Sequence, residues 1–443
     1  MLVAVRKWTG GWVPRLPLLL AAGLLTAHQG LTASQNVLTL QHAITLGGAG
    51  NDRATATAFI TTNVIAVAGV FEQTLVLGAN TLQSAGEQDG FVAVMTDGHF
   101  EWAFRIGGVG LDSVDAVCVG TNGSVYAAGR FAGTINVGGV QLISTAGTTD
   151  GFLVAFSRAG EFQWIRQLGG NGDEFFSAIV SNGTNVFAAG SFTQNATLAG
   201  QTFSMSGGQS LLVASFKTTG SLEWARKVSS TQSIQPACVT LTSGGDLVVG
   251  GRFTGNATFS GPPVASVGDY DGFLALYTSA GTYSNRTILS GPGMDEITDA
   301  KVMADGKIVA TGNFSTGAAL AGQSLPAGET GGLIAVVDAN WNSSIARVLP
   351  AINARSLAIG KRGVIHLGGY CQGDFSIGTQ NFTAPSGATS AFVLSGALSG
   401  LVLGATIVSG DGFAYLFRMD GFEDQVALAG FASGAVTVDG QPI

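Results

Sequence analysis

The sequence predicts an all-β protein, a seven-bladed β-propeller of four-stranded repeats about 60 residues long. A glycine followed two positions later by an aromatic or small residue recurs seven times in the 443 residues, at intervals of 57–61. Each repeat holds four short apolar or alternating runs with turn residues between them. No segment sustains the 3.6-residue period of a helix. The recurring glycines are Gly69, Gly129, Gly190, Gly251, Gly312, Gly369 and Gly430.

The second repeat shows the expected strand order. Its apolar runs cover residues 116–119, 125–129, 152–156 and 162–166, and the first two are joined by Asn122-Gly123. Asn-Gly suits the positive φ angles of a type I′ turn, so these runs should pair tightly and antiparallel. Four antiparallel strands in each repeat favour propeller blades over a solenoid. Two further markers recur in this part of the repeat: Asp-Gly-Phe at Asp89, Asp150 and Asp271, and a tryptophan at Trp102, Trp164 and Trp224.

The chain ends are expected to close the ring. Residues 39–46, followed by Gly47-Gly48, align with the last strand of a repeat, whereas the C-terminal repeat provides its first two strands at residues 413–417 and 425–429. The N-terminal strand should therefore complete the last blade. The Asp-Gly-Phe strand of that blade has no evident donor, so this blade is either short or cut off by the end of the sequence. An open edge there would favour aggregation.

Residues 1–33 differ from the repeats. Arg6, Lys7 and Arg15 precede about a dozen apolar residues, a pattern typical of a signal peptide and too short for a membrane-spanning helix. The alternative is an uncleaved signal anchor. The chain is therefore expected to have two parts, a signal peptide over residues 1–33 and a single β-propeller domain over residues 34–443. We expect a secreted or cell-surface protein with no membrane span after signal removal, and a monomer.

Composition excludes nucleic acid as a partner and argues against a disulfide framework. The net charge is −8 and only 11% of residues are charged, whereas nucleic-acid binding needs a basic surface. The three cysteines, Cys118, Cys238 and Cys371, replace small or apolar residues within the repeats. We interpret them as buried thiols rather than as a disulfide framework.

A search for chemistry gives no catalytic, cofactor-binding or metal-binding residue. The four histidines, His28, His42, His99 and His366, are scattered, and the sequence has no His-x-x-x-His, Cys-x-x-Cys, Gly-x-Ser-x-Gly or Gly-x-x-x-x-Gly-Lys motif. Acidic residues recur at two places, however. Turn carboxylates can hold calcium, but one acid in each loop falls short of the ligand count that calcium needs. We interpret these acids as turn-capping residues, with calcium as the alternative. They are Asp52, Asp112, Glu174 and Asp295 after a glycine run, and Asp89, Asp150 and Asp271 in Asp-Gly-Phe.

A small hairpin is expected in each repeat between the marker aromatic and the Asp-Gly-Phe strand. Residues 134–143 and 196–203 are examples. The hairpins differ between repeats, so they are the first place to look for a binding surface. The alternative is that they shield the edges of the blades.

The repeat resembles the bacterial β-propeller repeat family known as SBBP. The resemblance rests on a Gly-Gly-x-Gly-x-acid run after the tryptophan, then Asn-Gly-x-Val and Ala-Gly-x-Phe, as between Trp102 and Phe131 and between Trp164 and Phe192. It covers about residues 37–443 and implies a propeller at the cell surface or outside the cell, with no assigned activity for most members. One departure is the absence of the lysine often found a few residues into the Asp-x-Phe strand. Here Val94, Ala155 and Leu276 stand at that place.

The function predicted from these observations is a non-catalytic secreted or cell-surface scaffold for binding or adhesion, with a protein or glycan ligand. Two alternatives stay open. Propeller enzymes assemble their sites from loops of several blades and leave no linear motif, so a secreted enzyme acting on glycans or other polymers is one. A structural surface component is the other. Whether the chain is an enzyme is left undecided, with the balance against it.

Overall fold

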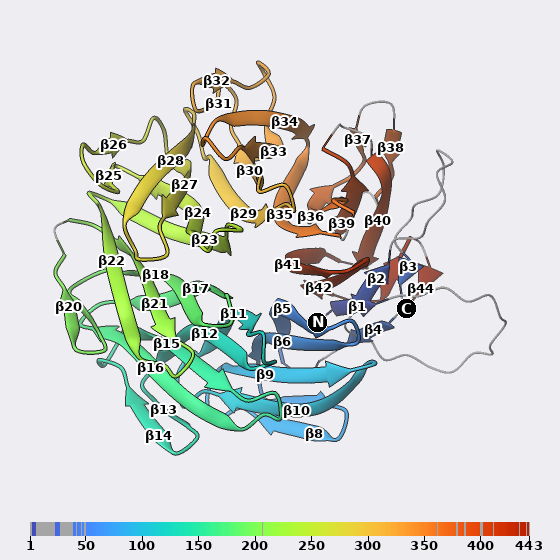
Figure 1. Ribbon diagram of the computed structural model, residues 1–443. Helices are drawn as coiled ribbons and strands as arrows, with labels where there is room; N and C mark the ends of the chain where they lie inside the picture. The colour runs from blue at the N-terminus through green and yellow to red at the C-terminus, as the bar shows by residue number, and fades with distance from the viewer. Residues whose placement is uncertain are drawn as a thin grey trace.

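We describe a computed structural model of the chain, which forms a β-propeller (Figure 1). The structure describes residues 2–5, 23–26, 39–40, 42–45, 47, 50–205, 207–360, 362–377, 380–384, 387–398, 402–410, 412–433, 435–439 and 441–442. Every described element is a strand. No helix in this part of the chain has the length and apolarity needed to cross a bilayer.

Seven strands line the centre of the ring, each antiparallel to the strand that follows it. Strand β41 lies next to β5, so the last repeat meets the first (Figure 1). The inner strands are β5 (Arg53–Thr61), β11 (Ser113–Val119), β17 (Glu174–Ser181), β23 (Ser233–Leu241), β29 (Glu296–Val302), β35 (Ile352–Ile359) and β41 (Ala414–Phe422). Their partners are β6 (Val64–Phe71), β12 (Val125–Ala132), β18 (Asn185–Phe192), β24 (Leu247–Thr254), β30 (Ile308–Phe314), β36 (Ile365–Gln372) and β42 (Gln425–Ala432).

Six of these pairs continue into a third and a fourth strand, giving six four-stranded blades. The third strands are β9 (Asp89–Thr96), β15 (Thr149–Phe156), β21 (Ser210–Lys217), β27 (Asp271–Tyr277), β33 (Gly331–Val337) and β39 (Thr389–Gly396). The outer strands are β10 (His99–Ile106), β16 (Phe162–Gly170), β22 (Leu222–Ser230), β28 (Tyr283–Ser290), β34 (Ser343–Pro350) and β40 (Val402–Gly410).

The expectation of seven blades is therefore wrong: the propeller has six. The last repeat contributes only the hairpin β41–β42 to the ring: the strands described after it are β43 (Val436–Val438), which pairs with β40 of the sixth blade, and the short strand that pairs with β43. Backbone pairing extends the hairpin on its outer side. Strands β1 (Leu2–Val5) and β2 (Gly23–Thr26) pair with β42, β3 (Thr39–Leu40) pairs with β2, and β4 (His42–Thr45) pairs with β1. The two described pieces of the strand expected at residues 39–46, β3 and β4, thus join this sheet through β2 and β1.

The small hairpins lie on the outer rim and cover blade edges. Strand β19 pairs with β16 of the preceding blade, and β25, β31 and β43 repeat this arrangement on β22, β28 and β40. An outer strand otherwise presents a row of unpaired backbone groups. The shielding interpretation is confirmed for these four hairpins. The hairpin strands are β7 (Thr74–Leu77), β8 (Asn80–Gln83), β13 (Thr134–Val137), β14 (Val140–Ile143), β19 (Ala196–Leu198), β20 (Gln201–Phe203), β25 (Asn256–Thr258), β26 (Val264–Ala265), β31 (Ala319–Leu320), β32 (Gln323–Ser324), β37 (Phe375–Ile377), β38 (Gln380–Phe382), β43 and β44 (Gln441–Pro442).

The aromatic markers of the sequence form the blade cores. Phe131, near the end of the second strand of its blade, lies against Phe152 of the Asp-Gly-Phe strand with the ring centroids 6.5 Å apart, and both are fully buried. Burying one such side chain stabilises the fold by about 1.5–3 kcal/mol. The first and fourth blades repeat this pair, as Phe71–Phe91 and Phe253–Phe273.

The marker tryptophans join consecutive blades. The indole Nε1 of Trp164 donates to the carbonyl oxygen of Thr218 in the next blade at 2.8 Å. The same bond runs from Trp102 to Arg158 at 3.0 Å and from Trp224 to Ser279 at 3.0 Å. Each tryptophan therefore links two blades by a hydrogen bond and also packs between them.

Candidate functional site

A cavity of about 600 Å³ opens at the centre of the ring. Its wall is built by a β-bulge that occurs at the same place in all seven inner strands. In β11, for example, the pairing with β12 skips Asp115, between Val114 and Ala116. A bulge turns one side chain out of the regular alternation, and here all seven bulge residues line the cavity: Thr55, Asp115, Ser177, Ala237, Thr298, Arg355 and Phe417.

Three of the bulge hydroxyl groups tie neighbouring inner strands together. Thr55 Oγ1 donates to the carbonyl oxygen of Val114 at 2.5 Å, immediately before the next bulge. Ser177 and Thr298 make the same bond to Pro236 at 2.9 Å and to Ala354 at 3.1 Å. These three side chains are therefore engaged in holding the ring. The cavity is left with Asp115, Arg355 and Phe417 as its distinctive bulge residues.

Arg418 follows the Phe417 bulge and closes the inner end of the cavity. Its guanidinium donates from Nη1 to the carbonyl oxygen of Thr298 at 3.1 Å and from Nη2 to that of Ala237. The same side chain borders a second cavity of about 80 Å³, beside Asp299 and Lys301. Arg418 thus stands between an open mouth and a smaller inner chamber.

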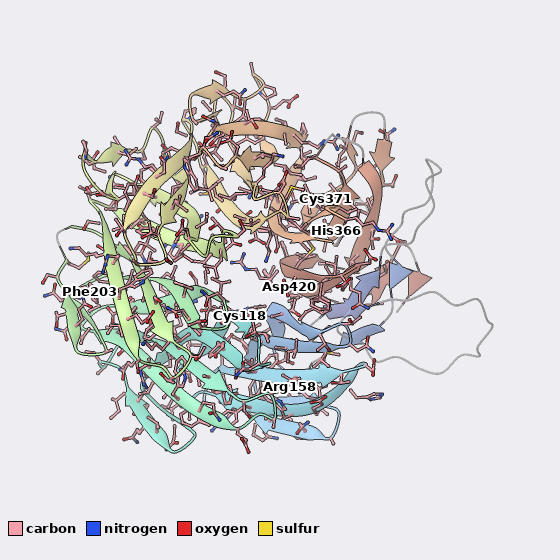
Figure 2. The ribbon with its side chains drawn as sticks, viewed as in Figure 1. Cys118, Arg158, Phe203, His366, Cys371 and Asp420 are labelled. Atoms are coloured by element: carbon pink, nitrogen blue, oxygen red, sulfur yellow. The ribbon has the colours of Figure 1, made fainter. Side chains whose placement is uncertain are left out.

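Buried polar groups around the inner chamber link three blades and the hairpin. Asp299 Oδ2 accepts hydrogen bonds from Leu357 N at 2.8 Å and from Ser356 Oγ at 2.7 Å. Ser356 Oγ in turn accepts from Met419 N at 2.9 Å. Strand β41 is held on its other side, where Asp420 Oδ2 accepts from Phe59 N at 2.9 Å. Asp420 lies toward the centre of the ring, far from Phe203 on the rim (Figure 2).

One sector of the mouth combines aromatic rings with a guanidinium. Tyr370 and Tyr415 lie edge to face with their ring centroids 4.9 Å apart. The guanidinium carbon of Arg355 is 5.4 Å from the Tyr370 ring centre, and Arg355 Nη2 donates to the Tyr370 hydroxyl at 3.2 Å. Phe417, 36% exposed, also lines the cavity. This sector offers flat apolar surface beside donors, as ligand pockets commonly do.

Two carboxyl groups line the cavity, and they differ in environment. Both oxygens of Glu296 are engaged: Oε1 accepts from Asn313 at 2.9 Å and from Arg355 at 3.3 Å, and Oε2 accepts from Arg252 at 3.3 Å. Within the described chain, the side chain of Asp115 accepts a hydrogen bond from Ser113 Oγ alone, at 3.1 Å. Burial within the ring raises the pKa of Asp115, although the charges of Arg130 and Arg53 and the Ser113 bond oppose that rise.

The acidic residues singled out in the sequence lie away from this cavity. They lie where consecutive blades meet. Most of them cap turns as predicted, whereas Glu174 accepts no hydrogen bond within the described chain. Asp112 accepts backbone hydrogen bonds from Gly108 at 2.6 Å and Ala132 at 2.9 Å. Asp295 accepts from Ser315 N at 2.6 Å, and Asp89 from Ala85 N at 3.0 Å. No group of three or more His, Cys, Asp or Glu side chains suited to a metal ion occurs within the described residues.

The cysteines are free and buried, as expected. Burial raises the pKa of the Cys238 thiol to about 12 and that of Cys371 to about 11, so neither thiol ionises near neutral pH. His366 is 1% exposed, and its Nδ1 lies 2.8 Å from Ser395 Oγ. Burial lowers the pKa of His366 to about 4. These residues belong to the interior of the blades.

Sequence reasoning missed the axial residues. A bulge changes the alternation of a strand by a single residue, and Thr55, Asp115 and Arg355 share no residue type that a motif search could detect. The repeat alignment could have placed them, because each stands three residues after the acid or its substitute at the start of an inner strand. Six residue types occupy that column in the seven repeats.

The comparisons with known proteins give likeness of fold only. No protein-family model matches the sequence, and no curated protein is similar to it. Among solved structures, the WD40 β-propeller domain of Doa1 is similar at 11% identity with a TM-score of 0.40, covering 81% of this chain and 94% of that one. The Dos1 propeller is similar at 8% identity with a TM-score of 0.42, covering 87% of this chain and 93% of that one.

Proposed function

We propose that this chain is a non-catalytic binding scaffold that takes its ligand at the mouth of the axial cavity. One observation supports the proposal above the others. The same bulge recurs in all seven inner strands, yet the residue that it turns toward the axis changes from Asp115 to Arg355 to Phe417. A repeated frame with varied side chains provides a surface whose chemistry can be set at each position independently.

The size and lining of the cavity agree with ligand recognition. Its volume of about 600 Å³ falls within the range of about 300–1,000 Å³ common for ligand pockets. Tyr370, Tyr415 and Phe417 supply apolar faces, and Arg53 and Arg355 supply donors. Aromatic faces beside charged hydrogen-bonding groups suit a sugar ring or a peptide side chain. The rim hairpins are the weaker candidate, because four of them are used in covering blade edges.

The competing proposal of a glycan-cleaving enzyme gains no support from the cavity. Acid–base hydrolysis of a glycosidic bond uses two carboxyl groups. Of the two at this mouth, Glu296 has both oxygens engaged by two arginines and an asparagine, so neither oxygen is free to approach a substrate.

A secreted or cell-surface location, in a protein of the SBBP type, is part of the proposal. It rests on the basic and apolar pattern of residues 1–33 and on the repeat motifs. Expression in a host with a secretory pathway tests it: the protein should reach the medium or the cell surface, with an N-terminus shortened by about 30 residues on mass spectrometry. An intact N-terminus on cytoplasmic protein would contradict export.

The binding proposal is tested with the full chain on a glycan array and on a peptide array, each with and without calcium. Tyr415→Ala removes an aromatic face of the mouth, and Val140→Ala, on the exposed face of hairpin β13–β14, is the matched rim control. We expect one ligand class to bind, with loss of binding in the Tyr415 variant only. Loss in the rim variant only would place the site on the hairpins. No binding on either array would favour a structural role.

A further inference from the structure

The two acidic markers of the sequence meet where one blade packs on the next. At three blade junctions, the Asp-Gly-Phe carboxyl of one blade faces the carboxyl that begins the inner strand of the following blade. Charge repulsion between the partners contributes to a raised pKa of the second acid in each pair, after the larger effect of burial. All six side chains are at most 2% exposed. The pairs are Asp89–Asp112, Asp150–Glu174 and Asp271–Asp295.

The acids of each pair are kept or lost together. Strand register identifies the equivalent positions: Asp150 pairs with Phe131, as Ser210 pairs with Phe192. At three further junctions, both acids are replaced by uncharged residues. At the seventh, Asp52 precedes β5 and accepts from Glu72 N, and the hairpin β41–β42 before it has no Asp-Gly-Phe strand among the described residues. Where a junction has both positions, the two acids therefore occur together. The replacements are Ser210 with Ile234, Gly331 with Ile352, and Ser390 with Ala414.

One pair receives a positive charge from the protein itself. Arg105 Nη1 lies 3.0 Å from Asp89 Oδ2. Register again gives the equivalent residues, since Arg105 pairs with Phe91 of the Asp-Gly-Phe strand. In the other two blades that position holds Gln167 and Ile288. Among the described residues, no ion pair is recorded for the acids of these two junctions.

Four of the carboxyl oxygens at these two junctions have no hydrogen-bond partner within the described chain. They are both oxygens of Glu174 and one oxygen each of Asp150 and Asp271. The Gly172 N–H lies near enough to Glu174 to oppose the rise of its pKa, but it makes no hydrogen bond of ordinary geometry. Leaving buried polar atoms unpaired is costly. The backbone keeps room for the carboxyl, because a Cβ at Gly169 would lie 2.1 Å from Asp150 Oδ2.

We propose that the Asp150–Glu174 and Asp271–Asp295 junctions each bind a divalent cation, calcium by its chemistry, in the place of the charge that Arg105 gives to the first junction. Calcium prefers oxygen ligands, and these pairs offer carboxylate oxygens alone. Two carboxylates leave the other coordination positions to backbone carbonyl groups and water. Sites with so few charged ligands bind calcium with dissociation constants of about 10⁻⁴–10⁻³ M, the range of extracellular modules. Such an ion would tie one blade to the next.

The test is equilibrium dialysis of the full chain against radioactive calcium at pH 7.5, together with thermal unfolding in calcium and in chelator. We expect two ions bound by each chain and an increase in Tm with calcium. D150N/E174Q should bind one ion, and adding D271N/D295N should abolish binding. These amide variants should fold without calcium, because they remove the repulsion between the carboxyl groups. Ser210→Ala, at a junction without acids, is the matched control and should bind two ions.

The competing explanation is a proton shared within each pair. It predicts no saturable calcium binding and a Tm that depends on pH equally in calcium and in chelator. That result would overturn the proposal, as would two ions bound by the variant with all four acids replaced. Calcium binding that releases protons, measured in buffers of different ionisation enthalpy, would support it, because the ion must displace the proton that the buried acids hold.

Discussion

Arg418 Nη1 donates to the carbonyl oxygen of Thr298 at 3.1 Å, across the axis of the ring. Its Nη2 donates to the carbonyl oxygen of Ala237. Both acceptors are bulge residues, which the pairing of their strands skips. A bulged residue is left unpaired in the ladder. Arg418 therefore satisfies carbonyl groups that the bulges release, and one side chain of the hairpin β41–β42 holds two distant blades.

Replacing Arg418 with alanine should lower the free energy of unfolding by about 1.5–3 kcal/mol, the usual contribution of hydrogen bonds to a charged group. The loss is limited because water in the cavity can reach the freed carbonyl groups. Urea unfolding followed by tryptophan fluorescence measures it. Arg418→Lys keeps the charge but cannot donate to both carbonyl groups in the same geometry. Its free energy of unfolding should lie between those of the parent and the alanine variant. An unchanged urea midpoint for the alanine variant would show that the bridge contributes nothing to stability.

Gly220 provides a second test, at the tie between the third blade and the second. A Cβ on Gly220 would lie 2.6 Å from Trp164 Cδ2, and the residue has φ +83°. Gly220→Ala should therefore displace the indole and weaken its bond to Thr218. Gly245→Ala is the matched control, because Gly245 has φ +84°, closes its turn with the same kind of backbone hydrogen bond to the residue three positions earlier, and has nothing within 4 Å of its Cβ position. The control should cost about 1–2 kcal/mol for backbone strain, and Gly220→Ala about 1–3 kcal/mol more for overpacking. Equal losses in thermal unfolding would contradict a role for the Trp164 contact.

Much of the fold could be predicted from the sequence because its signals are local. Asn122-Gly123 selects a hairpin turn, and the markers Phe131 and Phe152 repeat at the spacing that later brings their rings together. The number of blades was predicted wrongly because the last repeat was counted as a blade, although the sequence already showed no donor for its Asp-Gly-Phe strand. After β42 the described chain forms only β43 and β44, and β43 pairs with β40 as the equivalent hairpin strands pair with the blade before them.

The candidate site was not predicted from the sequence, because its residues come from different repeats. Asp115 and Arg355 are far apart in the chain, and only ring closure places them around one cavity. The acidic residues of the pairs were recognised in the sequence, but their pairing was not. Asp150 and Glu174 were both noted as recurring acids, but each was assigned to its own turn. Their meeting depends on how one blade stacks on the next, a relation between repeats that the pattern within a repeat does not show.

Buried His366 should make the protein less stable in acid. Its pKa is lowered from 6.5 to about 4 in the folded state, so between these pH values the unfolded chain binds a proton at His366 and the folded chain does not. Stability should therefore fall as pH decreases from about 6.5 to about 4, by about 3 kcal/mol over that range from this residue. His366→Asn can still hydrogen-bond Ser395. In this variant the fall of stability that residue 366 causes between pH 6.5 and pH 4 should disappear, even if the variant is less stable overall. Urea midpoints measured across that pH range test it, with exposed His99→Gln as the control that keeps the slope.

Glu174 should act in the opposite direction in the absence of calcium. Burial, followed by repulsion from Asp150 and Asp173, raises the pKa of Glu174 from 4.5 to about 8. The folded chain thus keeps a proton that the unfolded chain loses, and stability in chelator should fall as pH rises from about 4.5 to about 8. Glu174→Gln removes that ionisation, so it should gain about 2–4 kcal/mol over the parent chain at pH 8 and little at pH 4. Thermal unfolding in chelator at both pH values measures the difference, and exposed Glu161→Gln should match the parent at each. Equal stability of the Glu174 variant and the parent at pH 8 would mean that this carboxyl group ionises freely in the folded protein, and the unpaired environment described at its junction would then be wrong.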